Sequence, residues 1–265
     1  MVSLVDAHCH LDADELAPAE EAWARARAVG VDTIVMAGVD PANWAAQREV
    51  AARLPGVHTA FGIHPQLVAE LDEATAADHL AALARELATH RPVALGELGI
   101  DRLTEARKAT LGLQVEIFRA QLRLAIAHDL PLVLHILRAD APALAVLTAE
   151  GIPRAGGMVH SFSGSADFAR RLVALGLHVS FCGTLTFPQS RRLREAALAV
   201  PEERLLVETD SPDQTPEPER AALRGRSNRP EHLPSVVRAL ADVRGWSFER
   251  AAATTRENAR RLFRI

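Results

Sequence analysis

The stretch Asp6-Ala7-His8-Cys9-His10 closes a short apolar run at residues 2–5 that has the composition of a first β-strand. Successive side chains of a strand point to opposite faces, so His8 and His10 are expected on one face and Cys9 on the other. Two neighbouring imidazoles are a poor core element but a suitable pair of metal ligands. A His-x-His pair alone is weak evidence for a metal site, and the rest of the chain decides whether this pair has partners.

Apolar segments of strand length alternate with segments of helical pattern along the whole chain. The predicted strands occupy residues 2–5, 31–37, 57–63, 92–95, 130–134, 157–159, 177–181 and 205–208. The predicted helices occupy residues 16–29, 41–54, 75–90, 108–128, 140–150, 165–175, 189–199, 229–244 and 247–262. Eight such units in 265 residues predict parallel connections and a (β/α)8 TIM barrel, an α/β fold, in one domain spanning residues 1–265.

Metal-ligand residue types recur where the predicted strands end. An open doubly wound sheet would usually place its ligand site on one or two loops, whereas these candidates follow many strands and favour a closed barrel. Six nitrogen and oxygen ligands are too many for one tetrahedral ion and fit two divalent ions, such as Mg, Mn or Zn, bridged by a carboxylate and a water. The candidate ligands are His8, His10, Glu97, His135, His160 and Asp210.

Each candidate also has an ordinary structural interpretation when it is taken singly. His135 and His160 could be hydrogen-bonded core histidines, Glu97 could cap the following helix, and Asp210 could form a turn. Six ligand types at strand ends would then have to coincide by chance. We therefore favour the interpretation of a common site at the carboxyl ends of the barrel strands.

Composition narrows the classes of protein to which the chain could belong. A net charge of −4 gives no general argument for nucleic-acid binding, so such contact would need a local patch. The sequence has no apolar run of transmembrane length and no signal-peptide pattern, which predicts a cytoplasmic protein without membrane association. Two cysteines cannot form a disulfide framework, and the single lysine, Lys108, falls in a predicted helix.

Five motifs follow one another along the chain: Asp6-Ala7-His8-Cys9-His10-Leu11-Asp12, Gly62-Ile63-His64-Pro65, Gly96-Glu97-Leu98-Gly99-Ile100-Asp101, His160-Ser161-Phe162-Ser163-Gly164-Ser165 and Glu208-Thr209-Asp210-Ser211-Pro212. In this order they resemble the motifs of the TatD family of metal-dependent deoxyribonucleases. The resemblance continues through residues 228–230 and 258–263 and covers essentially the whole chain. It implies a metal-binding TIM barrel related to the amidohydrolases, with the six candidates named above as metal ligands and His64 in the active site.

Two positions depart from the family pattern. Arg102 stands where the family commonly has an aromatic residue, and Leu137 stands where it usually has an arginine, with Arg138 following. Both positions flank the expected substrate cleft, so they bear on substrate preference more than on metal binding.

Roles for the candidate side chains follow from their chemistry. Glu97 is the best bridging carboxylate, because the only lysine lies in a predicted helix and cannot serve as a carboxylated bridge. Asp210 could take a proton from the attacking water and return it to the leaving oxygen. Asp6 and Glu208 share strand parity with His8 and Asp210, so they either orient imidazoles or form a polar layer of the barrel.

Substrate contacts are expected from arginines and a few aromatic residues. Arg138 and the loop arginines Arg220, Arg224, Arg226 and Arg229 could hold phosphate, although the loop could equally be a solvated segment with Asn228 as a helix N-cap. Aromatic residues make up 4% of the chain and include no Tyr, so stacking would be limited to a terminal base. The candidates for stacking are Phe61, Phe162 and Phe187.

Three functions remain open at this point. The first is a metal-dependent deoxyribonuclease that removes nucleotides 3′ to 5′ from single-stranded DNA with a metal-activated water, as the resemblance implies. The second is a hydrolase of a carbonyl bond on the same centre, for instance a D-aminoacyl-tRNA ester or a cyclic amide. An arginine-lined cleft would favour the first and a closed apolar pocket the second. A non-enzymatic metal-dependent scaffold ranks third, because six ligands exceed the needs of a structural site. No obligate protein partner is expected.

Overall fold

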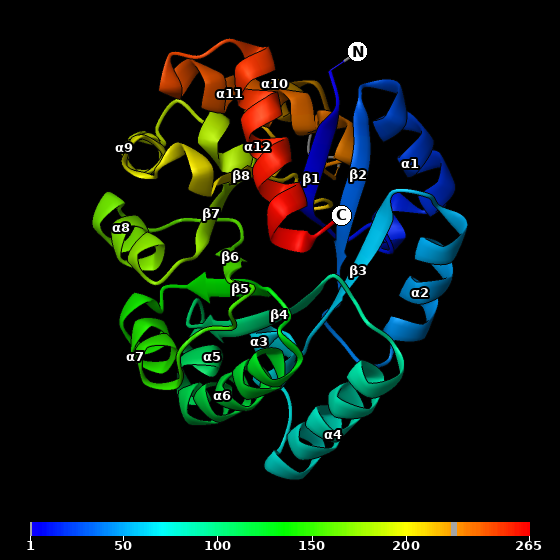
Figure 1. Cartoon of the computed structure of the whole chain (residues 1–265), viewed down its shortest axis with the longest axis vertical. Helices are drawn as coiled ribbons and strands as arrows, with labels where there is room; N and C mark the ends of the chain where they lie inside the picture. The colour runs from blue at the N-terminus through cyan, green and yellow to red at the C-terminus, as the bar shows by residue number, and fades with distance from the viewer. Residues whose placement is uncertain (1, 224–226) are drawn as a thin grey trace.

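Eight parallel strands form the centre of the fold in the computed structural model, which describes residues 2–223 and 227–265 (Figure 1). Each strand pairs with the next one along the chain, so the spatial order β1 to β8 is the sequence order. This order confirms the predicted (β/α)8 TIM barrel. The strands are β1 (Leu4–Cys9), β2 (Val31–Ala37), β3 (Val57–Phe61), β4 (Ala94–Asp101), β5 (Leu132–Leu137), β6 (Gly157–Val159), β7 (His178–Phe181) and β8 (Leu205–Val207).

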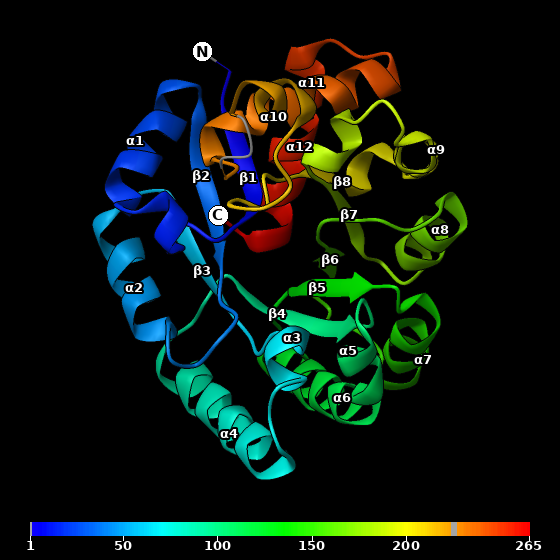
Figure 2. The same ribbon diagram turned by 180° about the vertical axis from the view of Figure 1, so that it is seen from behind.

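Helices connect the strands and surround them, as the two opposite views show (Figure 1 and Figure 2). The α-helices are α1 (Ala19–Ala28), α2 (Trp44–Arg53), α3 (Pro65–Val68), α4 (Glu73–Thr89), α5 (Glu105–Ala109), α6 (Leu111–His128), α7 (Asp140–Glu150), α8 (Ala166–Ala174), α9 (Arg191–Ala199), α10 (Glu217–Leu223), α11 (Leu233–Arg244) and α12 (Phe248–Phe263). Four short 3-10 helices complete the described elements: η1 (Asp14–Leu16), η2 (Gly183–Thr186), η3 (Glu202–Arg204) and η4 (Pro230–His232). None of the helices in the described ranges combines the length and the apolar character needed to cross a membrane.

The barrel closes between β8 and β1 through the backbone around the candidate ligands. The Asp210 N–H donates to the His8 carbonyl at 3.0 Å, and the His10 N–H donates to the Ser211 carbonyl at 2.8 Å. These two bonds place the segments that carry His8, His10 and Asp210 side by side at the carboxyl ends of the strands.

The interior of the barrel is filled with small and medium apolar side chains, and α12 covers its amino-terminal end (Figure 1). Burial of this layer removes apolar surface from water and fixes the strands from below the site. Its buried members are Val5, Ala7, Val35, Ala60, Ala94, Val133, Met158 and Leu206 from the strands, with Ala259, Leu262 and Phe263 from α12.

Among the eight strands, β4 is the one whose observed bounds differ most from the predicted ones. It runs through residue 101, whereas the prediction ended it at residue 95, just before Gly96. Both glycines have positive φ, and a Cβ at Gly99 would lie 2.0 Å from the His135 carbonyl oxygen. The missing side chains therefore let β4 lie against β5 rather than end the strand.

Two buried glutamines of α6 hold the backbone beneath the site. The Gln114 side-chain oxygen accepts from the Asp101 N–H at 2.8 Å. The Gln121 amide makes two bonds with Ile63, accepting from its N–H at 2.8 Å and donating to its carbonyl at 3.0 Å. Because a buried backbone group without a partner is costly, these contacts fix the chain where it turns from β3 and β4 towards the site.

Candidate metal centre

His8 and His10 point to the same side, as the strand alternation predicts, and their Nε2 atoms lie 3.3 Å apart. Cys9 is buried in the core on the other side. The pairing of β1 with β2 shifts between Asp6 and Cys9, where two residues of β1, Ala7 and His8, face one of β2, Val35. Such a bulge redirects side chains at a strand end, and here it occurs at the first candidate ligand.

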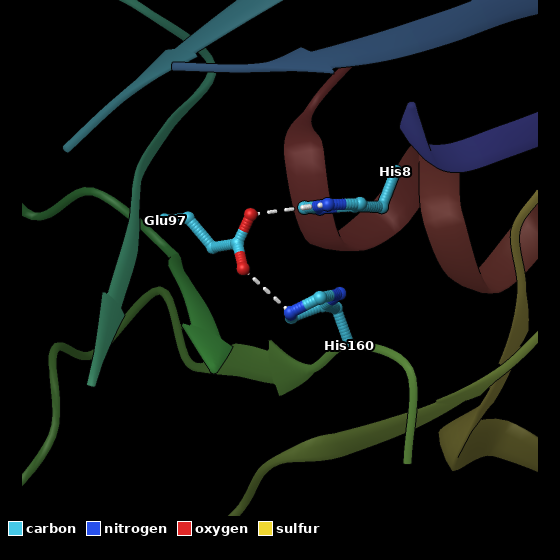
Figure 3. A group of neighbouring side chains, drawn as sticks. All are labelled: His8, Glu97 and His160. Carbon is cyan, nitrogen blue, oxygen red and sulfur yellow. Dashed lines mark ion pairs between the residues drawn. The ribbon is translucent and has the colours of Figure 1, made fainter. Parts of the chain in front are cut away.

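Glu97 lies at the centre of the site and is almost fully buried. Its Oε1 atom lies 2.9 Å from His135 Nδ1 and 2.7 Å from His160 Nε2. Its Oε2 atom faces the other way, 3.3 Å from His8 Nε2 and 3.7 Å from His10 Nε2. Figure 3 shows the carboxylate between the rings of His8 and His160, with one oxygen towards each. The two oxygens of the Glu97 carboxylate thus face two different groups of imidazole rings.

A second irregularity directs Glu97 into the barrel. The pairing of β4 with β5 shifts between Leu95 and Leu98, where two residues, Gly96 and Glu97, again face one, Val133. Gly62 of the neighbouring chain segment lies against this point, since a Cβ there would come within 2.7 Å of the Glu97 backbone nitrogen. The bulge and the close glycine explain locally why Glu97 points inward.

Asp210 completes the group around His8 and His10. Its Oδ1 atom lies 3.4 Å from His8 Nε2 and 3.8 Å from His10 Nε2. The residue has a left-handed backbone with φ of 57°, a conformation that aspartate tolerates better than most side chains. This turn directs the carboxylate back over the barrel end.

The hydrogen-bond partners of His64 and His135 distinguish the roles of the two rings. His64 Nδ1 accepts from the Gln66 N–H at 3.1 Å, so the proton of the neutral ring lies on Nε2 and is donated to Glu97 Oε1 at 2.8 Å. His135 Nε2 lies 3.3 Å from Asp101 Oδ2 and donates to it, so the neutral ring carries its lone pair on Nδ1, facing the centre. His135 is therefore suited to bind a cation, whereas His64 presents an N–H group.

The buried charges of the site balance one another. Burial disfavours an ionised Glu97, but the imidazoles of His160, His64 and His8 outweigh burial and hold the Glu97 pKa well below its usual range. Burial also disfavours a charged His160, yet the adjacent Glu97 carboxylate raises the His160 pKa to about 10. Burial lowers the pKa of His8 to about 3. The Glu97 carboxylate is thus ionised, and the imidazoles around it compensate its charge.

The donor atoms fit a divalent metal centre. Glu97 Oε2 is buried and has no hydrogen-bond partner among the described residues, although two imidazole nitrogens face it. Imidazole nitrogens and carboxylate oxygens are ligands that Zn and Mn favour, while carboxylates also suit Mg. Within the described ranges, three groups of side chains converge closely enough to hold an ion: His8, Glu97 and His160; His8, His10 and Asp210; and His64, Glu97 and His135.

Asp6 and Glu208, expected to orient imidazoles or to line the barrel, are both fully buried. Asp6 accepts from the backbone and hydroxyl of Thr209 and contacts His8 only through its backbone N–H, so it joins strands rather than orienting a ring. Glu208 accepts from the Ser161 N–H and lies 3.8 Å from His160 Nδ1. Burial raises the pKa of Asp6 to about 7 and that of Glu208 to about 8.

A cleft of about 600 Å³ opens above the centre. No arginine or lysine of the described residues lines it, and three carboxylates, Asp40, Glu70 and Asp213, stand along its wall. Polar and apolar side chains complete the lining: Val39, Asn43, Gln66, Leu67, Leu103, Ile136, Leu137, Ser161, Ser163, Thr184 and Gln214, with the candidate residues His10, His64, Glu97, His135, His160 and Asp210.

None of the described arginines that were expected to bind phosphate lines the cleft. Arg138 is exposed beyond β5 and Arg229 is half-buried, and neither lines the cleft. Arg226 lies outside the described residues, as does Arg224. Arg220 packs over the Phe187 ring, with its guanidinium carbon 5.3 Å from the ring centroid.

Two of the aromatic residues expected to stack on a base are unsuited to it. Phe61 and Phe162 are almost fully buried, because their rings fill the hydrophobic core. Of the three candidates only Phe187 is partly accessible.

Sequence reasoning missed Asp101 and Gln66, which contact the candidate site. Asp101 ends the motif that begins at Gly96 and lies four residues after Glu97, so alternation along one continuous strand could have placed it on the same face. The prediction ended the strand too early for that inference.

Comparison with known proteins shows relatives along the whole chain. The family described as "TatD related DNase" matches residues 5–264. A Bacillus subtilis protein named uncharacterized metal-dependent hydrolase YabD is 35% identical over 99% of this chain and 99% of its own length. An Erwinia billingiae protein named 3'-5' ssDNA/RNA exonuclease TatD is 33% identical over 91% of both chains.

A solved structure shares the fold closely. The crystal structure of YjjV, a TatD homologue from Escherichia coli, superposes with a TM-score of 0.90 and 29% identity, covering 99% of this chain and 98% of that one. Sequence profile, relatives and barrel architecture agree over nearly every residue. The chain belongs to the TatD family of metal-dependent hydrolases.

Proposed function

We propose that this protein is a deoxyribonuclease that removes nucleotides from the 3′ end of single-stranded DNA, acting as one domain with two divalent ions, Mg, Mn or Zn. The observation that carries the proposal is the Glu97 carboxylate, whose two oxygens face separate groups of imidazoles. A pair of ions held in this way suits an in-line displacement at phosphorus. The name of the Erwinia billingiae relative supports nucleic acid as the substrate.

The side chains divide into two sets around Glu97. His8, His10 and Asp210 would hold one ion with Glu97 Oε2, and His135 and His160 would hold the other with Glu97 Oε1. Divalent ions there would stabilise negative charge developing on a phosphate and lower the pKa of water.

Asp210 and His64 would move or hold protons. Asp210 lines the cleft, so its carboxylate can accept a proton from the attacking water and return it to the 3′ oxygen released from phosphorus. The P–O3′ bond breaks, leaving a strand shortened by one nucleotide and a 5′ mononucleotide. His64 donates its Nε2 proton to Glu97 Oε1, which holds the shared carboxylate in place.

The cleft bears on how a strand would be bound. Its volume of about 600 Å³ is that of a pocket for a small ligand rather than of a long groove. With no arginine or lysine among the described lining residues, phosphate recognition would depend on the ions and on hydroxyl groups such as Ser161 and Ser163. This arrangement favours a strand end over the middle of a long strand.

The test uses single-stranded DNA labelled at its 5′ end, so that each shortened product stays visible. The protein is stripped of metal, then given Mg, Mn or Zn, with Asp210→Asn as the inactive control. A metal-dependent ladder that descends one nucleotide at a time supports the proposal. Internal fragments appearing before the ladder contradict exonuclease action. Intact DNA with metal bound contradicts the substrate assignment.

One observation favours a second candidate, a hydrolase of a carbonyl bond. The carboxylates Asp40, Glu70 and Asp213 in a cleft without described basic residues suit a substrate that carries an ammonium group. A D-aminoacyl-tRNA ester has such a group beside the scissile carbonyl. Release of the amino acid from this ester, under conditions that leave DNA intact, would support the second candidate over the first.

A further inference from the structure

Asp101 is a buried carboxylate at the end of β4 that none of the proposed catalytic steps uses. Its Oδ1 atom accepts from the Leu103 N–H at 2.8 Å. Its Oδ2 atom accepts from Gln66 Nε2 at 3.0 Å and from Arg107 at 2.9 Å, and lies 3.3 Å from His135 Nε2. Four donors from separate segments thus converge on a carboxylate with no exposed surface.

The contact with His135 determines which of its ring nitrogens carries the proton. A carboxylate accepts hydrogen bonds and cannot donate, so the Nε2 atom facing Asp101 must hold the hydrogen. In the neutral ring, the form that binds a cation, the lone pair is then on Nδ1, which lies 2.9 Å from Glu97 Oε1 and 3.1 Å from His160 Nε2. Asp101 therefore prepares His135 to bind a cation through Nδ1.

Gln66 connects the contact between Asp101 and His135 to the neighbouring ring of His64. Its backbone N–H donates to His64 Nδ1, which keeps the His64 proton on Nε2, while its side chain donates to Asp101. The two rings lie 4.5 Å apart between centroids, yet they present opposite groups to the centre. His135 presents a lone pair and His64 presents an N–H group.

We propose that Asp101, held by Gln66 and Arg107, is a positioning residue that fixes the ring tautomer of His135 and so creates one half of the metal centre. The role is specific to the half that contains His135 and His160. His8, His10 and Asp210 make no contact with Asp101 in the described structure, so the other half is independent of it. This inference rests on the proposed two-ion centre and not on the identity of the substrate.

The test measures zinc affinity by competition with a chromophoric chelator, which needs no substrate. Wild type is expected to show two binding steps, and His10→Ala identifies the step that belongs to the first half. Asp101→Asn is expected to weaken the other step by about 10- to 100-fold and to leave the first within about threefold. Gln66→Met should weaken the same step to a smaller degree. Asp78→Asn, which changes an exposed carboxylate on α4, is the matched control.

A second readout is independent of variant folding. In zinc-loaded wild type, nitrogen NMR of the imidazoles should show His135 protonated on Nε2 and coordinated through Nδ1. Coordination through His135 Nε2 would overturn the proposal. It would also be overturned if folded Asp101→Asn bound both ions as wild type does, or lost both equally. Failure to cleave DNA with these metal results intact would refute only the proposed substrate.

Discussion

Asp6 and Thr209, which are 203 positions apart in the sequence, are joined by two hydrogen bonds between β1 and the chain after β8. Asp6 Oδ1 accepts from the Thr209 N–H at 2.9 Å, and Asp6 Oδ2 accepts from the Thr209 hydroxyl at 2.5 Å. The Thr209 carbonyl in turn accepts from the Asn228 side chain at 2.8 Å. All three residues are fully buried. The carboxylate therefore fastens β1 to the chain after β8 directly beneath the proposed ligands.

Removing one of these bonds should destabilise the barrel closure. In Thr209→Val the shape of the side chain is kept while the hydroxyl is lost, leaving one oxygen of the buried Asp6 without a partner. We expect the free energy of unfolding to fall by about 1–3 kcal/mol, the cost of an unpaired buried polar group. Urea titration of the metal-free protein measures the change. An unchanged midpoint would mean that water or rearrangement replaces the bond.

The sequence predicted the barrel and the convergence of the candidate ligands at its strand ends because both depend on local patterns. Apolar strands and amphipathic helices repeat with visible periods, and histidines at strand ends stand out against them. The extent of β4 could not be predicted from local patterns, because glycines such as Gly96 and Gly99 are typical of turns. Only the neighbouring strand shows that their missing side chains make room for the backbone of Val133 and His135.

The substrate cleft was predicted less well than the metal centre. Arginine positions in a loop do not reveal where the side chains point, and Arg138 lies outside the cleft although it follows a strand that carries a ligand. Phe61 and Phe162 are core residues. The sequence alone does not show whether an aromatic side chain is buried or exposed. Such properties depend on contacts between distant segments.

Gln121 should be important for stability, although glutamine is a residue type usually found on the exposed face of a helix. Gln121→Leu would leave the N–H and the carbonyl of Ile63 buried without their partners. At about 1–3 kcal/mol for each group, we expect a loss of roughly 2–6 kcal/mol in the free energy of unfolding. Chemical denaturation monitored by circular dichroism measures it. Gln189→Leu, at an exposed position, should change stability by less than about 0.5 kcal/mol.

His178 should make stability depend on pH. Burial at the start of β7, assisted by repulsion from Arg204, lowers its pKa to about 4 from an ordinary value of 6.5. Between these values the unfolded chain binds a proton that the native ring does not. The stabilisation is thus complete above about pH 6.5 and is lost as the pH falls towards 4, by up to roughly 3 kcal/mol.

The His178 contribution can be isolated by comparing pH profiles. His178→Gln cannot take up this proton, so its free energy of unfolding should fall less than that of wild type between pH 7.5 and pH 5. Both proteins are measured free of metal, and the remaining histidines contribute equally to each profile. Parallel profiles would show that the native His178 titrates normally.

Glu97 should affect both halves of the metal centre, since each of its oxygens faces a different group of imidazoles. In Glu97→Gln the charge and one acceptor oxygen are lost while the size of the side chain is kept. We expect both zinc-binding steps to weaken by more than about 100-fold, whereas His10→Ala weakens only one. Chelator competition and metal analysis of the purified proteins measure the difference.

Glu195→Gln, which removes only an exposed ion pair with Arg191 on α9, should bind zinc as wild type does. If Glu97→Gln lost one ion and retained the other at full affinity, the carboxylate would serve a single ion and would not be shared.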